Sequence, residues 1–275
     1  MPELPEVETI ASVLRHGSDH HPSLLDKTIL GAHLLWERTL AYPSPAEFRE
    51  KIIGQVIHEI GRRGKFLLFS LSQDTLLIHL RMSGDLLVEP SSNPPANHHR
   101  LMLDSDGGLR LAFNDPRKFG RVWLVANPEQ VLGSLGPEPL SPQFTPEMFY
   151  QQLQKHDRQL KPLLLDQTFL AGLGNIYADE ALHRAKLHPQ MRAASLNRAQ
   201  AERLWTSIRQ VLQEGIQRSG ASIDWVYRGG DFQHYFRVYR RNGEPCPECG
   251  TPIQRILVGQ RGTHFCPSCQ PFSKP

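Results

Sequence analysis

The apolar residues of the chain follow three patterns, and each pattern predicts a different kind of element. Near the start they recur at the helical spacing i, i+3, i+4 and i+7, at Val7, Ile10, Ala11 and Leu14. This spacing places the four side chains on one face of a helix, which we predict from Pro5 to about His16. The helix begins directly behind the first residues of the chain, MPELPE.

Between residues 51 and 125 the pattern changes to short apolar runs with Gly, Asp and Asn between them. The runs are KIIGQVIHEI, KFLLFSL, DTLLIHL, RLMLDSD, GLRLAF and GRVWLVA. Runs of this length between turn residues are typical of antiparallel strands in a sandwich or a barrel. The pattern therefore predicts a β-rich first domain.

The third pattern is helical again and follows a stretch rich in proline, VLGSLGPEPLSPQFTP, which we interpret as a linker. Helices are predicted in PEMFYQQLQKH, in KPLLLDQ, in GNIYADEALHRAK and around the apolar stripe from Leu204 to Leu212. After Gly220 the periodicity fades into an aromatic and basic segment. The sequence thus predicts a second, helical domain with a basic segment behind it.

The composition adds the protein class. With 275 residues, 39% of them hydrophobic and 21% charged, the chain is typical of globular proteins with one large or several smaller domains. No apolar run approaches the roughly 20 residues that span a bilayer, and the acidic start lacks the regions of a signal peptide. We therefore expect a cytoplasmic protein without a membrane partner.

The charge is distributed unevenly. The net charge is +3, but residues 228–275 alone hold seven Lys or Arg and only three Asp or Glu. A basic module attracts polyanions such as nucleic acid, although a solvated positive face gives the same count.

All four cysteines lie in this basic segment, in two C-x2-C pairs with sixteen residues between them: Cys246, Cys249, Cys266 and Cys269. This spacing is typical of a four-thiolate zinc site, and the residues between the pairs predict a β-hairpin that turns near 259–262. Because all four thiolates are used, we predict one structural Zn²⁺ per chain. Two disulfides are the alternative, which the absence of a secretory signal disfavours.

Six motifs in order along the chain carry a resemblance: MPELPEVET, HLRMSG, FNDPRKFG, GLGNIYADEAL, CPEC and GQRGTHFCPSC. Together they resemble the formamidopyrimidine-DNA glycosylases, which are base-excision repair enzymes. The resemblance implies an α+β multidomain fold: an N-terminal catalytic β-sandwich with an N-terminal helix (1–132), a helical helix-two-turn-helix DNA-binding domain (133–228), and a basic segment with a zinc-finger hairpin (229–275). It further implies a bacterial monomer that acts on damaged double-stranded DNA at the nucleoid.

The resemblance also assigns chemistry to the first residues. Once Met1 is removed, the amine of Pro2 would attack C1′ of the damaged nucleotide and form a Schiff base. An α-amino group has an ordinary pKa of roughly 7.7 to 8.0, so a useful fraction is unprotonated. Glu3 would protonate the sugar ring oxygen, with Glu6 as a supporting carboxylate; favourable interaction with the helix dipole is the alternative for both.

Two cations complete the implied reaction, in which excision of an oxidised purine is followed by β,δ-elimination. Lys65, after the turn GRRG, matches the family lysine that assists β-elimination. Arg261 matches the zinc-finger arginine that contacts phosphate and transfers the proton for δ-elimination. The alternative interpretation, without the resemblance, is that Lys65 and Arg261 are solvated surface cations.

Excision from a duplex requires that the damaged nucleotide is flipped out of the stack. By resemblance, Met82 and Arg117 fill the vacated space, and Phe119 wedges the opposite side. A place in the β-sandwich core is the alternative for the two apolar residues. The neighbouring Gly84, Asp115 and Gly120 favour exposed loops instead.

Phosphate contacts are implied for a set of polar residues: His98, Arg117, Lys161, Asn175 and Arg261. Asn175 begins a predicted helix, whose free N–H groups form an anion site. His99 is the alternative to His98, which the H-x-R spacing favours.

Two alternatives to an enzyme for oxidised purines are left open. The segment DWVYRGGD is shorter than the glycine-rich lesion loop that is common in the family, so an endonuclease VIII-like enzyme for oxidised pyrimidines remains possible. A noncatalytic zinc-ribbon protein that binds nucleic acid would explain the cysteines and the basic segment but not the N-terminal motif.

Overall fold

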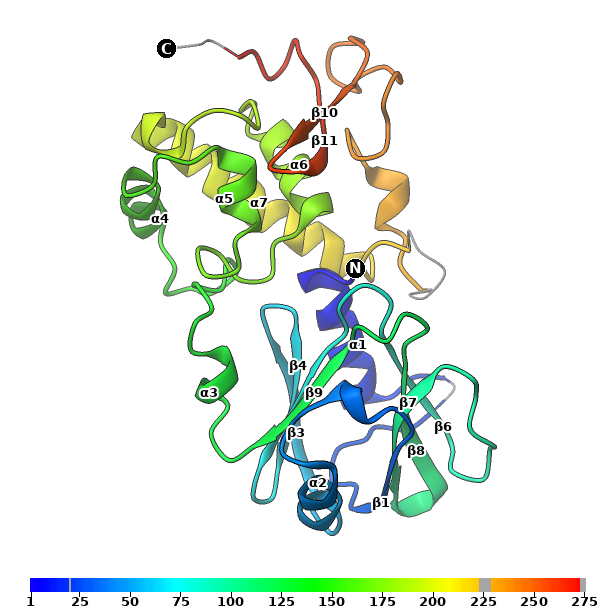
Figure 1. The fold of residues 1–275 in the computed structure, drawn as a ribbon. Helices are drawn as coiled ribbons and strands as arrows, with labels where there is room; N and C mark the ends of the chain where they lie inside the picture. Colours follow the sequence, from blue (N-terminus) through cyan, green and yellow to red (C-terminus); the bar gives the residue numbers. More distant parts are fainter. Residues whose placement is uncertain (20, 223–228, 273–275) are drawn as a thin grey trace. The chain divides into compact units, whose positions relative to one another are not determined.

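The computed structural model describes residues 1–19, 21–222 and 229–272. The chain divides into two compact units: Met1–Ser134 with Ser222–Gly230, and Leu135–Ala221 with Asp231–Pro275. The first unit holds a β-sandwich, and the second holds helices and a two-stranded hairpin (Figure 1).

The first unit contains two sheets. A five-stranded sheet has the order β2-β9-β5-β4-β3, and a four-stranded sheet has the order β1-β7-β8-β6. The strands are β1 (Ile29–Leu34), β2 (Leu40–Tyr42), β3 (Ile57–Arg63), β4 (Phe66–Leu71), β5 (Thr75–His79), β6 (Asp85–Pro90), β7 (His99–Ser105), β8 (Leu109–Asn114) and β9 (Arg121–Val125). Large side chains from both sheets, such as Phe69 and Phe113, share one core. The predicted β-sandwich is confirmed.

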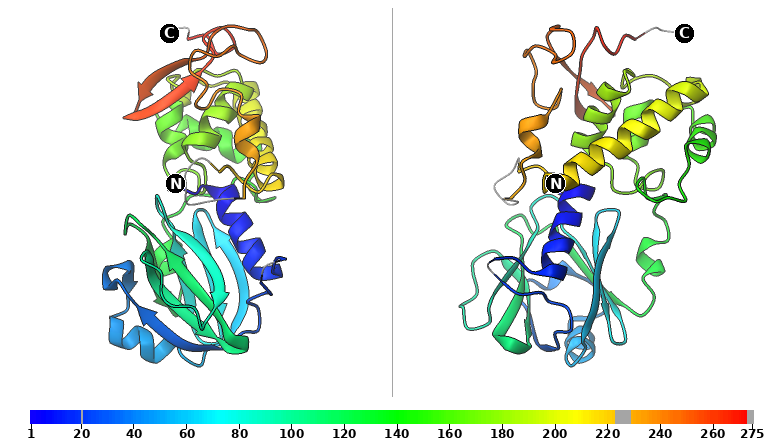
Figure 2. Two further views of the ribbon diagram at one scale, coloured as in Figure 1. Left: turned by 90° about the vertical axis from the view of Figure 1, so that its right-hand side faces the viewer. Right: turned by 180° about the vertical axis from the view of Figure 1, so that it is seen from behind.

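Helix α1 (Leu4–His16) packs against β3 and β4 and buries the predicted apolar stripe. Figure 2 shows it alongside the sandwich. Its start is fixed by a capping box, in which the side chain of Glu3 accepts the backbone N–H of Glu6. In return, the backbone N–H of Glu3 donates to Oε2 of Glu6 at 2.8 Å. Pro5 in the first turn removes an N–H that has no partner inside the helix.

The structure differs from the sequence prediction at the edges of the sandwich. Lys51 and Ile52, expected in a strand, end the helix α2 (Pro45–Ile52), which begins behind the cap Ser44 with a proline in its first turn. Strand β3 starts only at Ile57. A helical start signal of Ser and Pro therefore outweighs the apolar run that follows it.

Besides α2, three strands, one short helix and the 3₁₀ turns were not predicted. Strands β1 and β2 and strand β6 lie at sheet edges, where few side chains are buried and the alternation is weak. The short helix α3 (Glu129–Leu132) overlaps the start of the predicted linker. The remaining short 3₁₀ turns are η1 (Glu37–Thr39), η2 (Asp106–Gly108), η3 (Ala193–Ser195) and η4 (Phe232–Tyr235).

The second unit confirms the predicted helices and hairpin. Its elements are α4 (Pro146–Gln154), α5 (Leu160–Leu165), α6 (Asn175–Arg184), α7 (Arg198–Gln217), β10 (Gln254–Val258) and β11 (Arg261–Phe265). Helix α6 contacts α5, α7 and β11. It is thus the element on which α5, α7 and the hairpin converge.

Two adjacent buried carboxylates on α6 attach the hairpin region. Asp179 accepts the backbone N–H of His264 at 2.9 Å and forms an ion pair with Lys161. Glu180 accepts the backbone N–H groups of residues 237, 238 and 239 at 2.9, 3.0 and 2.8 Å. Burial raises the pKa of Glu180, and these three donors oppose the rise. Helices and zinc-finger region thus share one unit, and the boundary at residues 228 and 229 stays a prediction.

No helix in the described ranges is long and apolar enough to cross a membrane.

The half-buried carboxyl of Asp85, at the start of β6, makes the stability of the first unit depend on pH. Burial raises the pKa of Asp85 to about 6. A carboxyl with a raised pKa binds its proton more tightly in the folded state, so its contribution favours folding at low pH and turns unfavourable as the pH rises through about 6. We expect Asp85→Asn to raise the melting temperature relative to the parent more at pH 7.5 than at pH 5.

Asp106→Asn is the matched control, because the backbone N–H of Thr28 lowers the pKa of Asp106. Because the pKa of Asp106 lies below its ordinary value of 3.8, this carboxyl is ionised at both pH values, and Asp106→Asn should lower the melting temperature by the same amount at pH 5 and at pH 7.5. The same pH trend for both variants in thermal melts would contradict the assignment for Asp85.

Candidate functional site

The strand register of the first unit brings three predicted site residues to one end of the five-stranded sheet. Phe66 of β4 pairs with His79 of β5, which pairs with Arg121 of β9. Lys65 directly precedes the first of these residues, Met82 follows the second, and Phe119 precedes the third. The start of α1 lies at the same end of the sandwich (Figures 1 and 2).

A single buried carboxylate, Asp115, joins the two loops at this end. The hydroxyl of Ser83 donates to its Oδ1, and the backbone N–H of Gly120 donates to its Oδ2 at 2.7 Å. The backbone N–H of Arg117 approaches Oδ1 at 3.3 Å. The loop that contains Met82 and the loop of residues 115–120 are therefore held to one another through Asp115.

Asp115 also fixes the start of β7. Its own backbone N–H donates to the carbonyl of His98 at 2.8 Å, and Nε of Arg100 donates to the carbonyl of Asp115 at 2.7 Å. The side chain of His98 is exposed, whereas His99 is buried and accepts the backbone N–H of Ala96 through Nδ1. Of the two histidines, His98 is thus the one that a ligand can reach.

The two apolar residues in these loops face solvent. Met82 is 44% exposed and Phe119 is 47% exposed, so neither belongs to the sandwich core. The guanidinium carbon of Arg117 lies 5.0 Å from the centre of the Phe119 ring, within the range of a cation–π contact. The three residues implied to fill and wedge a DNA stack are therefore exposed on loops that Asp115 fixes.

The close packing of Gly120 shows how tightly the second loop is held. A Cβ atom at Gly120 would lie 2.2 Å from Cζ of Phe113, so no larger residue fits. The preceding Lys118 has a φ of 61°, which is unfavourable for a residue with a side chain. Such a conformation persists only where the surrounding contacts impose it.

At the N-terminus, Pro2 is half-buried and sits directly before the capping box of α1. Met1 is exposed, while the side chains of Glu3 and Glu6 are buried. Two buried carboxylates therefore lie next to the residue whose amine becomes the chain end once Met1 is removed.

Lys65 is buried at the turn between β3 and β4, directly after Gly64 with its positive φ of 58°. Its charge acts on His79: burial, together with the nearby cations Arg81 and Lys65, lowers the pKa of His79 to about 3. Nδ1 of the neutral ring accepts the backbone N–H of Arg81 at 3.0 Å. The lysine and the start of the Met82 loop therefore share one cationic neighbourhood.

The second unit holds the other implied phosphate contacts. Asn175 is the first residue of α6, and its Nδ2 donates to the carbonyl of Gly262 at 3.2 Å. Its Oδ1 is buried and has no hydrogen-bond partner among the described residues. The start of α6 is thus tied to the hairpin next to Arg261.

Arg261 is exposed at the predicted turn of the hairpin. It pairs with Val258 across a two-residue turn, in which Gly259 and Gln260 have φ angles of 54° and 61°. Positive φ at both positions is typical of the tight turn that matches the twist of a hairpin. The side chain therefore projects from a rigid tip.

Lys161 is buried, although a contact with a DNA phosphate would require an exposed side chain. Its side chain is fully buried, and Nζ forms an ion pair with Asp179. Its contact with a DNA phosphate stays a prediction, and in this structure its ammonium supports the carboxylate that holds the hairpin.

The four cysteines form a cluster of the size that zinc requires. All four sulfur atoms lie within 4.8 Å of one another, and neighbouring pairs lie 3.4, 3.5 and 3.9 Å apart. Zinc–sulfur bonds of about 2.3 Å in a tetrahedron place the sulfur atoms about 3.8 Å apart. No disulfide links the cysteines, so the set fits the structural zinc site and not the disulfide alternative.

Sequence reasoning missed the residues that hold the site, chiefly Ser83, Asp115, Asp179 and Glu180. Asp115 stands in the motif DPRKFG, where the sequence itself indicates only an exposed loop. Its link to the Met82 loop depends on Ser83, 32 positions away, and no spacing in the sequence indicates such a pairing.

Comparisons with known proteins agree with this geometry over the whole chain. Residues 1–122 match the formamidopyrimidine-DNA glycosylase N-terminal domain, residues 135–226 match the H2TH domain of the same enzymes, and residues 243–271 match the zinc finger found in FPG and IleRS. The formamidopyrimidine-DNA glycosylase of Chloroflexus aurantiacus is 49% identical over 98% of each chain.

Solved structures of the Lactococcus lactis enzyme are also similar. Its complex with DNA that contains N7-benzyl-Fapy-dG has a TM-score of 0.91 at 35% identity and covers 98% of this chain and all of its own. Its complex with DNA that contains an abasic site has a TM-score of 0.90 at 34% identity, with the same coverage. The chain belongs to the formamidopyrimidine-DNA glycosylase family.

Proposed function

We propose that this protein is a bifunctional DNA glycosylase and AP lyase that removes oxidised purines, such as 8-oxoguanine and formamidopyrimidines, from double-stranded DNA. The observation that carries the proposal is the capping box of α1, which places Pro2 next to two buried carboxylates. Family membership over the whole chain, and solved relatives that hold lesion-containing DNA, support the same conclusion.

The nucleophile is the secondary amine of Pro2 after removal of Met1. Its nitrogen attacks C1′ of the damaged nucleotide, the base leaves, and the sugar ring opens as its oxygen takes a proton. The product is an iminium between the proline nitrogen and C1′. Glu3 supplies the proton to the ring oxygen, and Glu6 holds the backbone of Glu3 in place through its 2.8 Å hydrogen bond.

Strand cleavage follows from the same intermediate. The iminium acidifies the hydrogens at C2′, so loss of a proton there expels the 3′ phosphate, and a second elimination expels the 5′ phosphate. Lys65 assists the first step, and the location of this buried cation at the end of the sheet supports that role. Arg261 assists the second step, and its exposure on a rigid hairpin tip suits contact with a phosphate.

Met82, Arg117 and Phe119 hold the duplex open while the nucleotide is flipped out. An apolar side chain inserted between base pairs replaces part of the lost stacking, which costs a few kcal/mol. The exposure of Met82 and Phe119 and their common anchor at Asp115 support this assignment.

Backbone contacts come from five polar residues in the two units: His98, Arg117, Lys161, Asn175 and Arg261. The exposure of His98 and the position of Asn175 at the start of α6 support their parts in this set. The part of Lys161 rests on the family resemblance alone, because its side chain is fully buried and its ammonium pairs with Asp179.

The lesion preference depends on the segment with the apparently short loop, and residues 223–228 of that segment lie outside the described residues. Preference for oxidised purines therefore rests on the family. The zinc-ribbon alternative accounts only for residues 243–271, and the match of residues 1–122 argues against it.

We also propose that the protein acts as a monomer in the bacterial cytoplasm, bound to the nucleoid. The bacterial source of the relatives and the four thiols, none in a disulfide, support this setting.

Trapping with borohydride tests the reaction, because reduction of the iminium leaves a stable covalent adduct. We expect the protein without Met1 to form an adduct with a duplex that contains 8-oxoguanine and none with an undamaged duplex. The variant Pro2→Gly should form far less of this adduct than the parent. Absence of any adduct with 8-oxoguanine or an abasic site would exclude the proposed reaction, and clear preference for thymine glycol would favour the endonuclease VIII-like alternative.

Substitution of Met82 tests base flipping. We expect Met82→Ala to slow excision of 8-oxoguanine from a duplex about tenfold, which corresponds to about 1.4 kcal/mol. Cleavage at a preformed abasic site should change much less, because no base has to be unstacked there. Single-turnover rates on the two substrates measure the difference.

Leu87→Ala is the control, since Leu87 is also apolar and exposed (38%) but lies on β6. Equal losses in both variants, or an equal loss on both substrates, would speak against a role of Met82 in flipping.

A further inference from the structure

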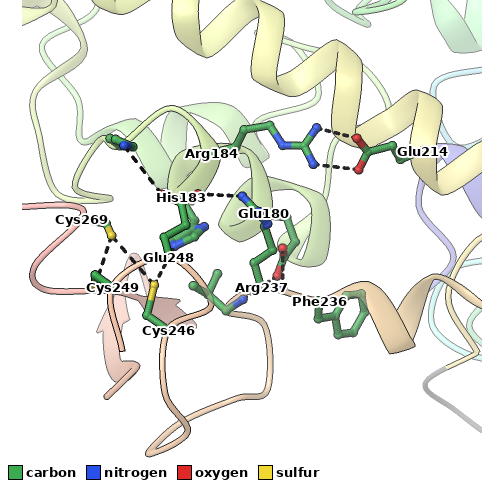
Figure 3. A network of polar contacts seen from close by, with 12 residues as sticks. Glu180, His183, Arg184, Glu214, Phe236, Arg237, Cys246, Glu248, Cys249 and Cys269 are labelled. Atoms are coloured by element: carbon green, nitrogen blue, oxygen red, sulfur yellow. Dashed lines mark hydrogen bonds and ion pairs between the residues drawn. The ribbon is translucent and has the colours of Figure 1, made fainter. Parts of the chain in front are cut away.

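Helix α6 places one side chain against the zinc centre. Nε2 of His183 lies 3.4 Å from the sulfur of Cys246, and both side chains are buried (Figure 3). This distance is in the range of N–H···S hydrogen bonds. His183 lies 63 positions before Cys246, and the zinc-finger pattern of the sequence contains no histidine.

The sulfur of Cys246 is the polar contact that the structure shows for the imidazole ring of His183. His183 is 0% exposed, and its Nδ1 is buried without a hydrogen-bond partner among the described residues. A zinc-bound thiolate has no proton to donate, so the hydrogen bond requires that Nε2 carries the proton and donates. The geometry therefore defines both the donor and the acceptor.

Neighbouring contacts hold the imidazole in this position. One turn earlier on α6, Glu180 accepts three backbone N–H groups from the segment that leads to Cys246. The next residue, Arg184, extends toward α7 instead and forms two hydrogen bonds with Glu214, at 2.6 and 2.8 Å (Figure 3). The segment before Cys246 is thus held to α6 by Glu180, one turn from His183, and not by Arg184.

The sulfurs of the centre differ in their donors. The backbone N–H of Cys269 approaches the sulfur of Cys266 at 3.4 Å, so that donor comes from the same zinc-binding turn. The donor to Cys246 comes from a helix of the helical domain. A hydrogen bond to a metal-bound sulfur offsets part of its negative charge and orients the ligand.

We propose that His183 is a positioning residue of the zinc site, which donates a hydrogen bond from Nε2 to the thiolate of Cys246 and thereby slows loss of the metal. The inference rests on the structural zinc site and is independent of the proposed catalytic reaction. Zinc retention is consequently coupled to the position of α6, whose first residue, Asn175, contacts the hairpin through Gly262.

The rate of zinc transfer from the full-length protein to the chromogenic chelator 4-(2-pyridylazo)resorcinol tests the proposal. The variant His183→Phe fills similar space without an N–H group. We expect it to raise the rate of zinc transfer to the chelator about 10- to 100-fold. His183→Gln places an amide N–H near the position of Nε2 and should stay within a few-fold of the parent. If His183→Phe does not fold, His183→Asn replaces it, because its amide is too short to reach the sulfur.

Arg184→Gln is the matched control. It removes the ion pair with Glu214 on the same turn of α6, so it should lower the melting temperature and leave zinc transfer at the parental rate. If His183→Phe transferred zinc at the same rate as the parent, the proposal would be overturned. Equal acceleration in His183→Phe, His183→Gln and Arg184→Gln would also overturn it, since the effect would then come from helix stability alone.

Cobalt substitution gives a readout that helix stability does not change. A hydrogen bond stabilises the sulfur lone pair, so its loss should move the sulfur-to-cobalt charge-transfer band of Co²⁺-loaded His183→Phe to lower energy. The His183→Gln protein should keep the parental band. Identical bands in the parent and in His183→Phe would contradict a hydrogen bond to Cys246.

Discussion

The reciprocal hydrogen bonds between Glu3 and Glu6 are the interaction on which the proposed catalytic end of the molecule depends. Chain termini are usually frayed, yet a reaction at the terminal amine needs that amine in a fixed position. The capping box fixes the backbone one residue behind Pro2, and the buried stripe of α1 attaches the helix to the sandwich. Burial of two carboxylates is costly, and their backbone donors offset part of that cost.

Buried carboxylates that accept backbone N–H groups also hold other residues of the proposed site. Asp115 collects donors from two loops, so that Met82 and Phe119 are exposed on a rigid support. Asp179 and Glu180 collect backbone N–H groups from the zinc-finger region, and so they attach the hairpin that carries Arg261 to α6. Buried carboxylates that accept backbone N–H groups thus position loops that regular secondary structure leaves free.

The sequence predicts what depends on local periodicity and spacing. The stripe from Val7 to Leu14, the helices of the second unit and the two C-x2-C pairs each concern neighbours in the chain, and the structure confirms them. The family's motifs add the candidate site residues, but they do not show what holds those residues. Ser83 lies 32 positions from Asp115, and the three donors to Glu180 lie 57 to 59 positions from it, so only the folded chain reveals these pairings.

Edge strands show the second limit of sequence reasoning. Strands β1 and β6 bury few side chains, so their apolar alternation is weak. At residues 51 and 52 the apolar run predicts a strand, whereas the Ser-Pro start signal several residues earlier makes these residues the end of a helix. Long-range pairing in one case and a distant cap in the other decide the structure, and neither is visible within the run itself.

The location of the trapped DNA adduct tests the central claim most directly. After borohydride reduction with an abasic-site duplex, digestion of the DNA and protein would be followed by mass spectrometry of the peptides. The account predicts the sugar remnant on the nitrogen of Pro2, in the peptide that begins PELPEVE. An adduct on the peptide that contains Lys65, with the N-terminal peptide unmodified, would contradict it.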